Sequence, residues 1–320
     1  MNSQELDYMS SLFRDATQEE KRDLINIMPN GILHQYYCRY TIPKQRGGVR
    51  YIYEPNGTLK KIQRRINKDI LKEVPVSEYA FAYVPGRSVL DNAKPHVKNP
   101  ILLKLDIHRF FDNIHFQSVF DIFKDMGHSM EFSRLLAGLI TIDDFLPQGA
   151  PTSPAISNIY LKEFDEEIGK YCKDNNIAYT RYSDDLTFSM QQFDSNLVKL
   201  VKEKLSELGL ELNKKKSRII SGPLQKRVTG VVVNEKPQAP KAYKREIRQE
   251  MYYVSRFGLR KHLEHRYNYF DEKAYVNHLL GRINFVLQLE KDNEEFKKYK
   301  AMLLIPSLDK MRSQLKDLLD

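Results

Sequence analysis

The hydrophobic and polar positions of this chain change between helical and strand periods, with no internal repeat. Residues 1–40 are polar and predict helices, and residues 49–53 alternate with the two-residue period of a strand after a turn at residues 45–48. Apolar residues recur at helical spacing over residues 59–74 and over residues 196–208, where a glycine ends the pattern. These two segments predict helices that each bury one apolar stripe.

A second group of segments predicts a sheet. Residues 101–105 form a short apolar run typical of a central strand, and residues 177–181 and 186–190 predict the two strands of a hairpin. Residues 115–140 predict further helix, and residues 227–233 return to a strand pattern. Because strands and helices do not alternate regularly, we expect an α+β fold.

The predicted hairpin carries two adjacent acids, Asp184 and Asp185, in a Tyr-Ser-Asp-Asp segment at residues 182–185. Like charges repel, and neither carboxylate can be buried without a compensating cation. Carboxylate oxygens suit Mg²⁺, which binds one or two protein acids and takes its other ligands from water and phosphates. A second Asp-Asp pair at residues 143–144 lies in a short link and is expected to face water, so the dipeptide alone does not establish a metal site.

Asp106 supplies a third carboxylate in a suggestive place. It directly follows the apolar run at residues 101–105, and an acid at the end of a buried strand is costly unless it has a partner. A strand that ends in an acid, beside a hairpin that carries two more, predicts the two-metal arrangement of phosphoryl-transfer enzymes. The alternative is that Asp106 caps the helix expected to start near residue 107, and the two roles are compatible.

Composition is that of a water-soluble enzyme. The 320 residues are 41% hydrophobic and 29% charged, and the mean hydropathy is −0.55. We see no run of 18 apolar residues and no signal peptide, so neither a membrane partner nor export is expected, and the cytoplasm is the expected compartment. Cys38 and Cys172 are too few for a disulfide framework or a zinc site.

The formal net charge of +9 predicts a polyanionic partner, and its distribution strengthens the prediction. Beyond the boundary marked by Pro237 and Pro240, residues 236–270 hold nine Lys or Arg against three Glu. Cations neutralise phosphates, and aromatic rings stack on unpaired bases. The alternative is a solvated basic helix whose tyrosines serve the core. The candidate nucleic-acid contacts are Lys241, Arg245, Arg248, Tyr252, Arg256 and Arg260, interleaved with Tyr243, Tyr253, Tyr267 and Tyr269.

Three motifs in fixed order resemble those of a reverse transcriptase, and the resemblance covers roughly residues 40–235. They are Leu-Asp-Ile-His-Arg-Phe-Phe at residues 105–111, Gln-Gly-Ala-Pro-Thr-Ser-Pro at residues 148–154, and Tyr-Ser-Asp-Asp at residues 182–185. The resemblance implies a right-hand polymerase with an antiparallel palm sheet and an α-helical thumb. Its parts are expected at residues 1–100 for the N-terminal helices and fingers, 101–235 for the palm and 236–320 for the RNA-binding thumb.

Within that family the chain is most similar to bacterial retron reverse transcriptases. Asn-Ala-Lys-Pro-His at residues 92–96 resembles their Asn-Ala-x-x-His element, with Asn92 and His96 as its fixed members. Residues 228–230 resemble their Val-Thr-Gly element through Val228, Thr229 and Gly230. Ser183 departs from the alanine more usual in retron enzymes, but it keeps a small side chain.

The resemblance also assigns roles to site residues. Asp106 and Asp184 are expected to bind two Mg²⁺ ions, with Mn²⁺ as a substitute and Asp185 as a less direct ligand. Phe111 is expected to exclude a 2′-hydroxyl from the incoming nucleotide, unless it is an ordinary core residue like Phe110. The remaining dNTP contacts are expected from Gln148, Arg50, Lys44 and Lys216; Lys44 is equally compatible with an ordinary surface role, and Lys216 is favoured over Lys214 and Lys215 as the family's lysine.

The retron likeness implies a specific reaction and specific partners. The enzyme would copy a cognate non-coding RNA that serves as template and as primer, starting from the 2′-hydroxyl of a guanosine. The product would be a branched RNA–DNA hybrid (msDNA), made from dNTPs, and a separately encoded effector protein would act with it in anti-phage defence. Two alternatives stay open: another bacterial reverse transcriptase, of abortive-infection or intron type, and a catalytically inert RNA-binding scaffold.

Overall fold

The computed structural model describes residues 1–27, 34–44, 47–266 and 271–304. The chain divides into two compact units, each built from two separate stretches of sequence. The first unit contains residues 1–87 and 101–219, and the second contains residues 88–100 and 220–320. The predicted fingers, palm and thumb boundaries stay a prediction.

A four-stranded sheet organises the first unit. Its strand order is β4-β5-β3-β6, formed by Ala178–Tyr182, Asp185–Met190, Ile101–Asp106 and Arg218–Ile220. The apolar run and the hairpin strands therefore form as the sequence predicts. β3 and β4 both pair antiparallel with β5, and the β3–β5 register places Asp106 opposite Asp185.

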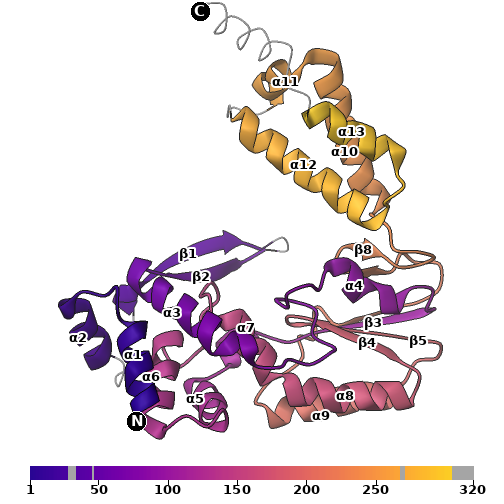
Figure 1. The fold of residues 1–320 in the computed structure, drawn as a ribbon. Coiled ribbons are helices and arrows are strands. Elements are labelled where there is room, and N and C mark those ends of the chain that lie inside the picture. The colour runs from indigo at the N-terminus through magenta and orange to yellow at the C-terminus, as the bar shows by residue number, and fades with distance from the viewer. Residues whose placement is uncertain (28–33, 45–46, 267–270, 305–320) are drawn as a thin grey trace, which may run out of the picture. The chain divides into compact units, whose positions relative to one another are not determined.

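The helices α8 and α9 run along one face of this sheet (Figure 1). Leu103 and Leu105 point toward that face, where Val198 of α9 lines the same groove. The predicted helix over residues 115–140 is in fact two helices, because Gly127 has a φ of +91° and ends the first. The bounds are Phe116–Asp125 (α5), Met130–Ile140 (α6), Ser153–Tyr160 (α7), Lys162–Asp174 (α8) and Ser195–Glu207 (α9).

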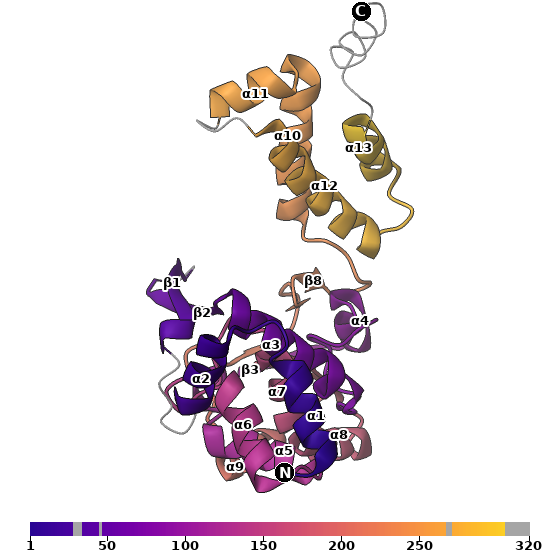
Figure 2. The same cartoon turned by 60° about the vertical axis from the view of Figure 1, so that its left-hand side comes forward.

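The N-terminal helices α1 (Ser3–Leu12) and α2 (Gln18–Ile27) agree with the helical prediction over residues 1–40, of which residues 28–33 lie outside the described residues. The prediction is wrong at its end, because residues 37–40 belong to the strand Tyr37–Pro43 (β1), which pairs with the next strand. Glu5 anchors α1, because its carboxylate accepts hydrogen bonds from the Ser129 backbone N–H and hydroxyl. Figure 2 shows α1 beside α3 and α6. Burial alone would raise the pKa of Glu5, but the hydrogen bonds from Ser129 outweigh it and lower that pKa.

A separate two-stranded hairpin, β1 (Tyr37–Pro43) and β2 (Val49–Pro55), precedes α3. The predicted turn between the strands is described only at Gly47 and Gly48. α3 spans Gly57–Asp69 and is followed by a short 3₁₀ turn at Leu71–Glu73, so the predicted helix ends about five residues early. On α3 the buried Gln63 amide donates to the Tyr37 hydroxyl at 2.7 Å, which fixes the hairpin to the helix.

The second unit combines a short hairpin with a helical bundle. The strand expected over residues 227–233 is two strands, β7 (Arg227–Val228) and β8 (Val231–Val232), with Thr229 and Gly230 as the turn. Both turn residues have positive φ, so the chain reverses there instead of continuing as one strand. The other helices are Val89–Ala93 (α4), Lys241–Phe257 (α10), Leu259–Arg266 (α11), Glu272–Leu289 (α12) and Glu294–Leu304 (α13).

Two further observations concern the described residues. None of their helices combines the length and apolar character needed to cross a bilayer. Cys38 is exposed and Cys172 is buried, and both are free thiols.

Gly169 tests how tightly α8 packs on the segment before α4. A Cβ atom there would overlap the Tyr79 ring, which is itself stacked on Tyr179 at 5.3 Å between centroids. We predict that Gly169→Ala lowers the free energy of unfolding by about 1–3 kcal/mol, because the ring has little room to move. The matched control is Gly281→Ala in α12, where the new methyl meets nothing and helix propensity improves. Chemical denaturation of both variants checks this, and equal stabilities would contradict it.

Candidate active site

The end of β3 and the β4–β5 turn bring three acids to one edge of the sheet. Asp106 and Asp185 are cross-strand partners, and the Ile107 N–H donates to the Asp184 carbonyl at 2.9 Å. Asp106 is the last residue of β3 and is followed by a turn, so it does not cap a helix. The three predicted acids are therefore neighbours in space, whereas the acids at residues 143–144 are exposed in their link.

Negative charge is crowded at this edge. Asp106 is 5% exposed, and its Oδ1 is buried without a hydrogen-bond partner. Burial, followed by the charges of Asp106 and Asp185, raises the pKa of Asp184 to about 6. The fold thus holds carboxylates together at a cost that a bound cation would relieve.

Lys216 supplies one cation within the site. Its Nζ lies 2.7 Å from Asp106 Oδ2 and forms an ion pair. The loop before it is docked along the end of β3, because the Asn213 N–H donates to the Asp106 carbonyl and the His108 N–H donates to the Glu211 carbonyl. Of the three consecutive lysines, Lys216 is the one that reaches the acids.

The carboxylate oxygens are of the type that binds a divalent metal, but the side chains are not arranged as a complete coordination sphere. Among the residues that the structure describes, no three His, Cys, Asp or Glu side chains form a ready-made metal cluster. The unpartnered oxygen of Asp106 and the raised pKa of Asp184 are nevertheless what a carboxylate site for Mg²⁺ would show before the ion neutralises it.

Gln148 is held against the β1–β2 hairpin. Its carbonyl accepts from the Tyr53 N–H at 2.8 Å, which continues β2 onto this loop. The next residue must be glycine: Gly149 has a φ of +118°, and a Cβ would lie 2.7 Å from Ile52 Cγ2 and 2.9 Å from the Tyr53 carbonyl oxygen. The strand that carries Arg50 is thereby fixed relative to Gln148.

Arg50 and Lys44 both belong to this hairpin region and are exposed. Arg50 lies opposite Ile42 and makes no ion pair with another described residue. Lys44 closes the hairpin by donating its N–H to the Gly48 carbonyl. Both side chains are thus available to phosphate, and their predicted dNTP contacts remain predictions.

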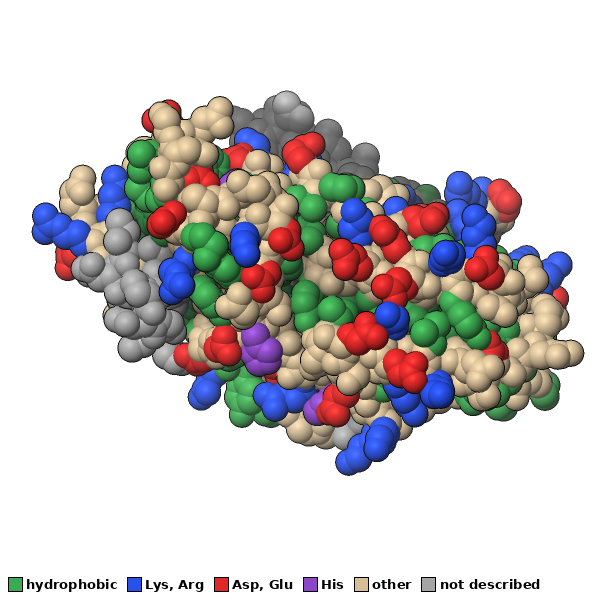
Figure 3. Space-filling model, turned by 90° about the horizontal axis from the view of Figure 1, so that it is seen from below, with side chains coloured by type: hydrophobic (Ala, Val, Ile, Leu, Met, Phe, Trp, Pro, Cys, Tyr) green, Lys and Arg blue, Asp and Glu red, His purple; other side chains and the backbone are tan. Residues whose placement is uncertain are grey.

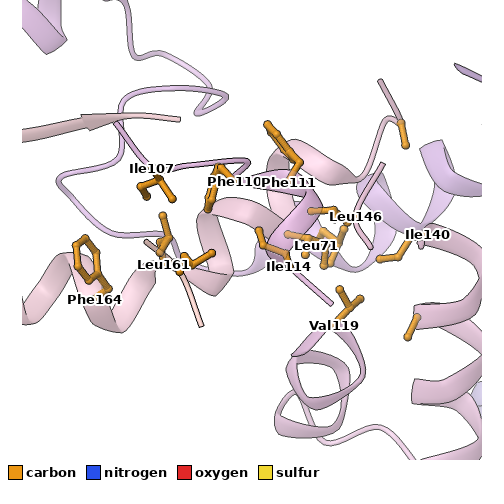
Figure 4. Close-up of a cluster of buried hydrophobic side chains, with 14 of the residues drawn as sticks. Leu71, Ile107, Phe110, Phe111, Ile114, Val119, Ile140, Leu146, Leu161 and Phe164 are labelled. Carbon is orange, nitrogen blue, oxygen red and sulfur yellow. The ribbon is translucent and has the colours of Figure 1, made fainter. Parts of the chain in front are cut away.

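Phe110 and Phe111 belong to the same buried cluster, with ring centroids 5.3 Å apart. Phe110 is 3% exposed, as expected of a core residue, and Phe111 is 8% exposed. Figure 4 shows the Phe111 ring at the margin of the drawn cluster, on the side away from Val119. Phe111 is therefore largely a core residue, and its role in sugar selection stays a prediction.

The two short retron-like elements meet in the second unit. The Asn92 amide donates to the Thr229 hydroxyl at 3.1 Å, and the Thr229 hydroxyl lies 3.5 Å from the Val89 carbonyl. Asn92, His96 and Val228 are buried, whereas Gly230 is exposed at the turn. Two stretches more than 130 residues apart in the chain are thus one structural element.

Four of the five basic residues of α10 share one face of the helix; the fifth, Lys244, is paired with Glu290. Lys241, Arg245, Arg248, Tyr252 and Arg256 recur at the spacing of helical turns and are all exposed, over about 22 Å of helix. They form the α10 stripe, opposite the buried face of the helix.

Some side chains of the α10 stripe already have partners within the protein. Arg248 makes two hydrogen bonds of 2.7 Å to Glu295, and Arg256 donates to the Tyr252 hydroxyl. Lys241 and Arg245 have no acidic partner among the described residues. Of the other predicted contacts, Arg260 pairs with Glu264, and Tyr267 and Tyr269 lie outside the described residues.

Sequence reasoning missed two residues beneath the acidic turn. The Tyr83 hydroxyl donates to Ser183 Oγ at 3.3 Å, and nothing in the sequence around Tyr83 signals this contact. Arg181 is fully buried and donates to the Ser183 carbonyl at 3.2 Å. The sequence did carry a signal for Arg181, because a charged residue within a predicted strand of otherwise mostly apolar residues needs a partner.

The crowding of the acids has a consequence for stability. A raised acid pKa means that the folded state holds its proton more tightly than the unfolded chain, so Asp184 lowers stability as pH rises from about 4 to 6. We predict that Asp184→Asn stabilises the protein in EDTA at pH 8 by at most about 3 kcal/mol, and much less at pH 4. Denaturation at both pH values checks this, with Asp143→Asn as the exposed control. A gain that is the same at both pH values would contradict it.

Comparison with known proteins shows the family of the chain. A family model described as reverse transcriptase (RNA-dependent DNA polymerase) matches residues 42–244. The retron Ec86 and Ec83 reverse transcriptases of Escherichia coli are 30% and 32% identical over 264 and 277 residues. These matches cover 79% and 80% of this chain, and 77% and 83% of the relatives.

The retron Mx65 reverse transcriptase of Myxococcus xanthus is 32% identical over 281 residues, covering 82% of this chain but only 63% of that relative. Among solved structures, telomerase from Candida albicans in complex with a fragment of telomeric RNA is similar at a TM-score of 0.47 and 10% identity, over 84% of this chain and 66% of that one, which is too distant to bear on function. The chain belongs to the reverse transcriptase family and, within it, to the retron reverse transcriptases.

Proposed function

We propose that this chain copies a cognate structured non-coding RNA into DNA, using that RNA as template and as primer. Synthesis starts from the 2′-hydroxyl of one guanosine, uses dNTPs and yields a branched RNA–DNA molecule. The biological role is anti-phage defence together with a separately encoded effector. Membership of the retron reverse transcriptases supports the RNA-directed DNA polymerase activity, and the priming and defence roles extend it.

The observation that carries the proposal is the meeting of Asp106, Asp184 and Asp185 around an unpartnered buried oxygen. Asp106 and Asp184 would hold two Mg²⁺ ions, with Asp185 beside them. When bound, such ions lower the pKa of the attacking hydroxyl and stabilise the charge on the leaving pyrophosphate. The chain's own task is to fix the position of the carboxylates, so that no reorganisation is needed during the reaction.

Cationic side chains of the first unit suit a triphosphate. Lys216 is already at the acids, 2.7 Å from Asp106 Oδ2, and can act as a proton donor to the leaving group once its carboxylate partner turns to a metal. Arg50 offers a guanidinium fork that matches phosphate oxygens, on a strand tied to Gln148. Phe111 presents a ring edge that would oppose a 2′-hydroxyl and so favour dNTPs.

The RNA partner fits the α10 stripe better than the underside of the molecule. Figure 3 shows acidic and basic side chains interspersed on that underside. On α8 and α9 of the first unit, for example, Lys204 pairs with Glu167. The α10 stripe instead presents cations with an exposed tyrosine among them, which suits phosphates and an unpaired base. Counterion release from such contacts makes RNA binding depend steeply on salt.

The competing functions differ in what they would produce. Another type of bacterial reverse transcriptase would extend an ordinary 3′-hydroxyl primer and leave linear DNA. An inert scaffold would bind RNA and make no DNA at all. The presence of all three acids argues against the scaffold, and the joined Asn92 and Thr229 elements favour the retron type.

The product distinguishes these functions. We predict that nucleic acid co-purified with the protein contains DNA joined to RNA through a 2′–5′ bond, because priming uses a guanosine 2′-hydroxyl. Sequencing, together with gel mobility before and after treatment with a debranching enzyme, checks this. Asp184→Asn should reduce DNA synthesis by about a hundredfold or more, whereas Asp143→Asn should not change it. Linear DNA alone would point to another reverse transcriptase, and full synthesis by Asp184→Asn would reject the site.

Salt dependence tests the α10 stripe. Replacing Arg245, which has no acidic partner, with Ala should reduce the log–log salt slope of RNA binding by about one unit. The control is Lys297→Ala, which removes the same charge from α13 at a site paired with Glu294. Fluorescence anisotropy over a salt series gives both slopes. If the two variants share the parent slope, Arg245 makes no phosphate contact.

A further inference from the structure

A fully buried ion pair lies directly beneath the acidic turn. The Arg181 and Asp165 side chains are both 0% exposed, and Arg181 Nη2 lies 2.6 Å from Asp165 Oδ2. The Arg181 Nε–H is shared between the two Asp165 oxygens at 2.8 and 3.0 Å, so the contact is two-pronged. Arg181 belongs to β4 and Asp165 to the first turn of α8.

Stability alone is a weak reason for such a pair. Removing two charges from water costs several kcal/mol per ion, and hydrophobic replacements are often as stable or more so. A buried pair therefore calls for a role that a pair of apolar side chains could not fill. The remaining donor of the guanidinium indicates which role this is.

That donor, Arg181 Nη1, points at the turn. It donates to the Ser183 carbonyl at 3.2 Å and to the Asn158 side-chain oxygen at 3.1 Å. Asn158 is itself fixed, because its amide donates to the Ala82 carbonyl at 2.8 Å. The backbone of Arg181 is held in turn by Tyr79 and Phe81, through hydrogen bonds of 2.7 and 2.8 Å. Contacts other than the one with the turn therefore already restrain the Arg181 guanidinium.

The turn requires such a restraint. Ser183 has a φ of +60°, a conformation that costs a residue with a Cβ about 1 kcal/mol or more. The following residue is Asp184, whose carbonyl accepts from the Ile107 N–H. The two carbonyls of the two-residue turn therefore each accept a hydrogen bond, one from Arg181 and one from Ile107. Together these contacts restrain the peptide planes before and after the Asp184 Cα, from which its side chain starts.

We propose that Arg181, oriented by Asp165, is a positioning residue that fixes the direction of the Asp184 carboxylate for metal binding. Asp165 neutralises the charge of Arg181. The arginine can therefore hold the Ser183 carbonyl without weakening the attraction of the three acids for a metal ion. This inference rests on the proposed metal role of Asp184. Arg181 touches neither substrate nor metal.

The network contains a matched control. The buried Tyr179 hydroxyl donates to Asp165 Oδ1 at 2.7 Å and does not reach the turn. Tyr179→Phe removes one hydrogen bond from the same carboxylate and leaves the Arg181–Ser183 contact in place. Arg181→Lys keeps a cation beside Asp165, but its single ammonium lacks the fork that serves Asp165 and the Ser183 carbonyl together.

The direct measurement is Mn²⁺ binding to the full chain, followed by electron paramagnetic resonance. We expect Arg181→Lys to weaken Mn²⁺ binding by about tenfold, and Tyr179→Phe to leave it within about twofold of the parent. Primer extension should show the same division, with kcat lowered at fixed Mg²⁺, recovery of part of the loss at higher Mg²⁺, and an unchanged KM for dNTP. Equal Mn²⁺ affinity in Arg181→Lys and the parent would overturn the proposal.

A triple variant separates positioning from folding. Arg181→Met, Asp165→Leu and Tyr179→Phe together replace the buried polar network with apolar side chains, which should preserve the fold. If this variant unfolds at or above the parent temperature and still binds Mn²⁺ weakly, the pair is there for position. If it folds and binds Mn²⁺ as the parent does, the pair is only structural and the proposal fails.

If the triple variant does not fold, Arg181→Lys against Tyr179→Phe decides the matter. The parent protein separates this proposal from the one on which it rests. A parent that binds no Mn²⁺, or whose Mn²⁺ binding survives Asp184→Asn, would refute the metal role of Asp184 itself. A parent that binds Mn²⁺ through Asp184 with no effect of Arg181→Lys would refute only the positioning role.

Discussion

The structure depends on holding three carboxylates close together although their charges repel. Asp106, Asp184 and Asp185 repel, and burial raises the cost, as the pKa of Asp184 near 6 records. A chain free to relax would turn these side chains apart or into water. Here the antiparallel register, the Ile107–Asp184 hydrogen bond and the turn geometry keep the backbone of these three residues together. A bound cation would relieve this repulsion, and that relief would add to the affinity of the site for the cation.

Cations of the chain are placed in two different ways around that charge. Lys216 is on an exposed loop and pairs with Asp106, so it can leave when a metal or a nucleotide arrives. Arg181 is buried and its charge is matched by Asp165, so it cannot leave and does not compete. Lys216 is thus an exchangeable counterion, because its side chain is exposed. Arg181 is a fixed structural contact, because its side chain is fully buried.

A backbone contact holds two of the nucleotide-binding candidates, Arg50 and Gln148, on neighbouring segments. The Tyr53–Gln148 hydrogen bond and the close approach at Gly149 attach the β1–β2 hairpin to the loop before α7. In the second unit, the Asn92–Thr229 hydrogen bond joins two family elements into one. In both places a short motif matters because it lets two segments approach, and glycine or a small polar side chain permits it.

The sequence alone determined the α+β class, β3, the β4–β5 hairpin, the helices with a clear apolar stripe (α3 and α9) and the family, because periodicity and motif order are local and survive without coordinates. It also identified the acids and the favoured lysine. It could not show that residues 227–233 reverse at Thr229, that Phe111 is largely buried, or that Arg248 is bound to Glu295. Those facts, like the Arg181–Asp165 pair, depend on which distant side chains meet. Only tertiary packing decides that, since a contact between remote residues leaves no periodic trace in the chain.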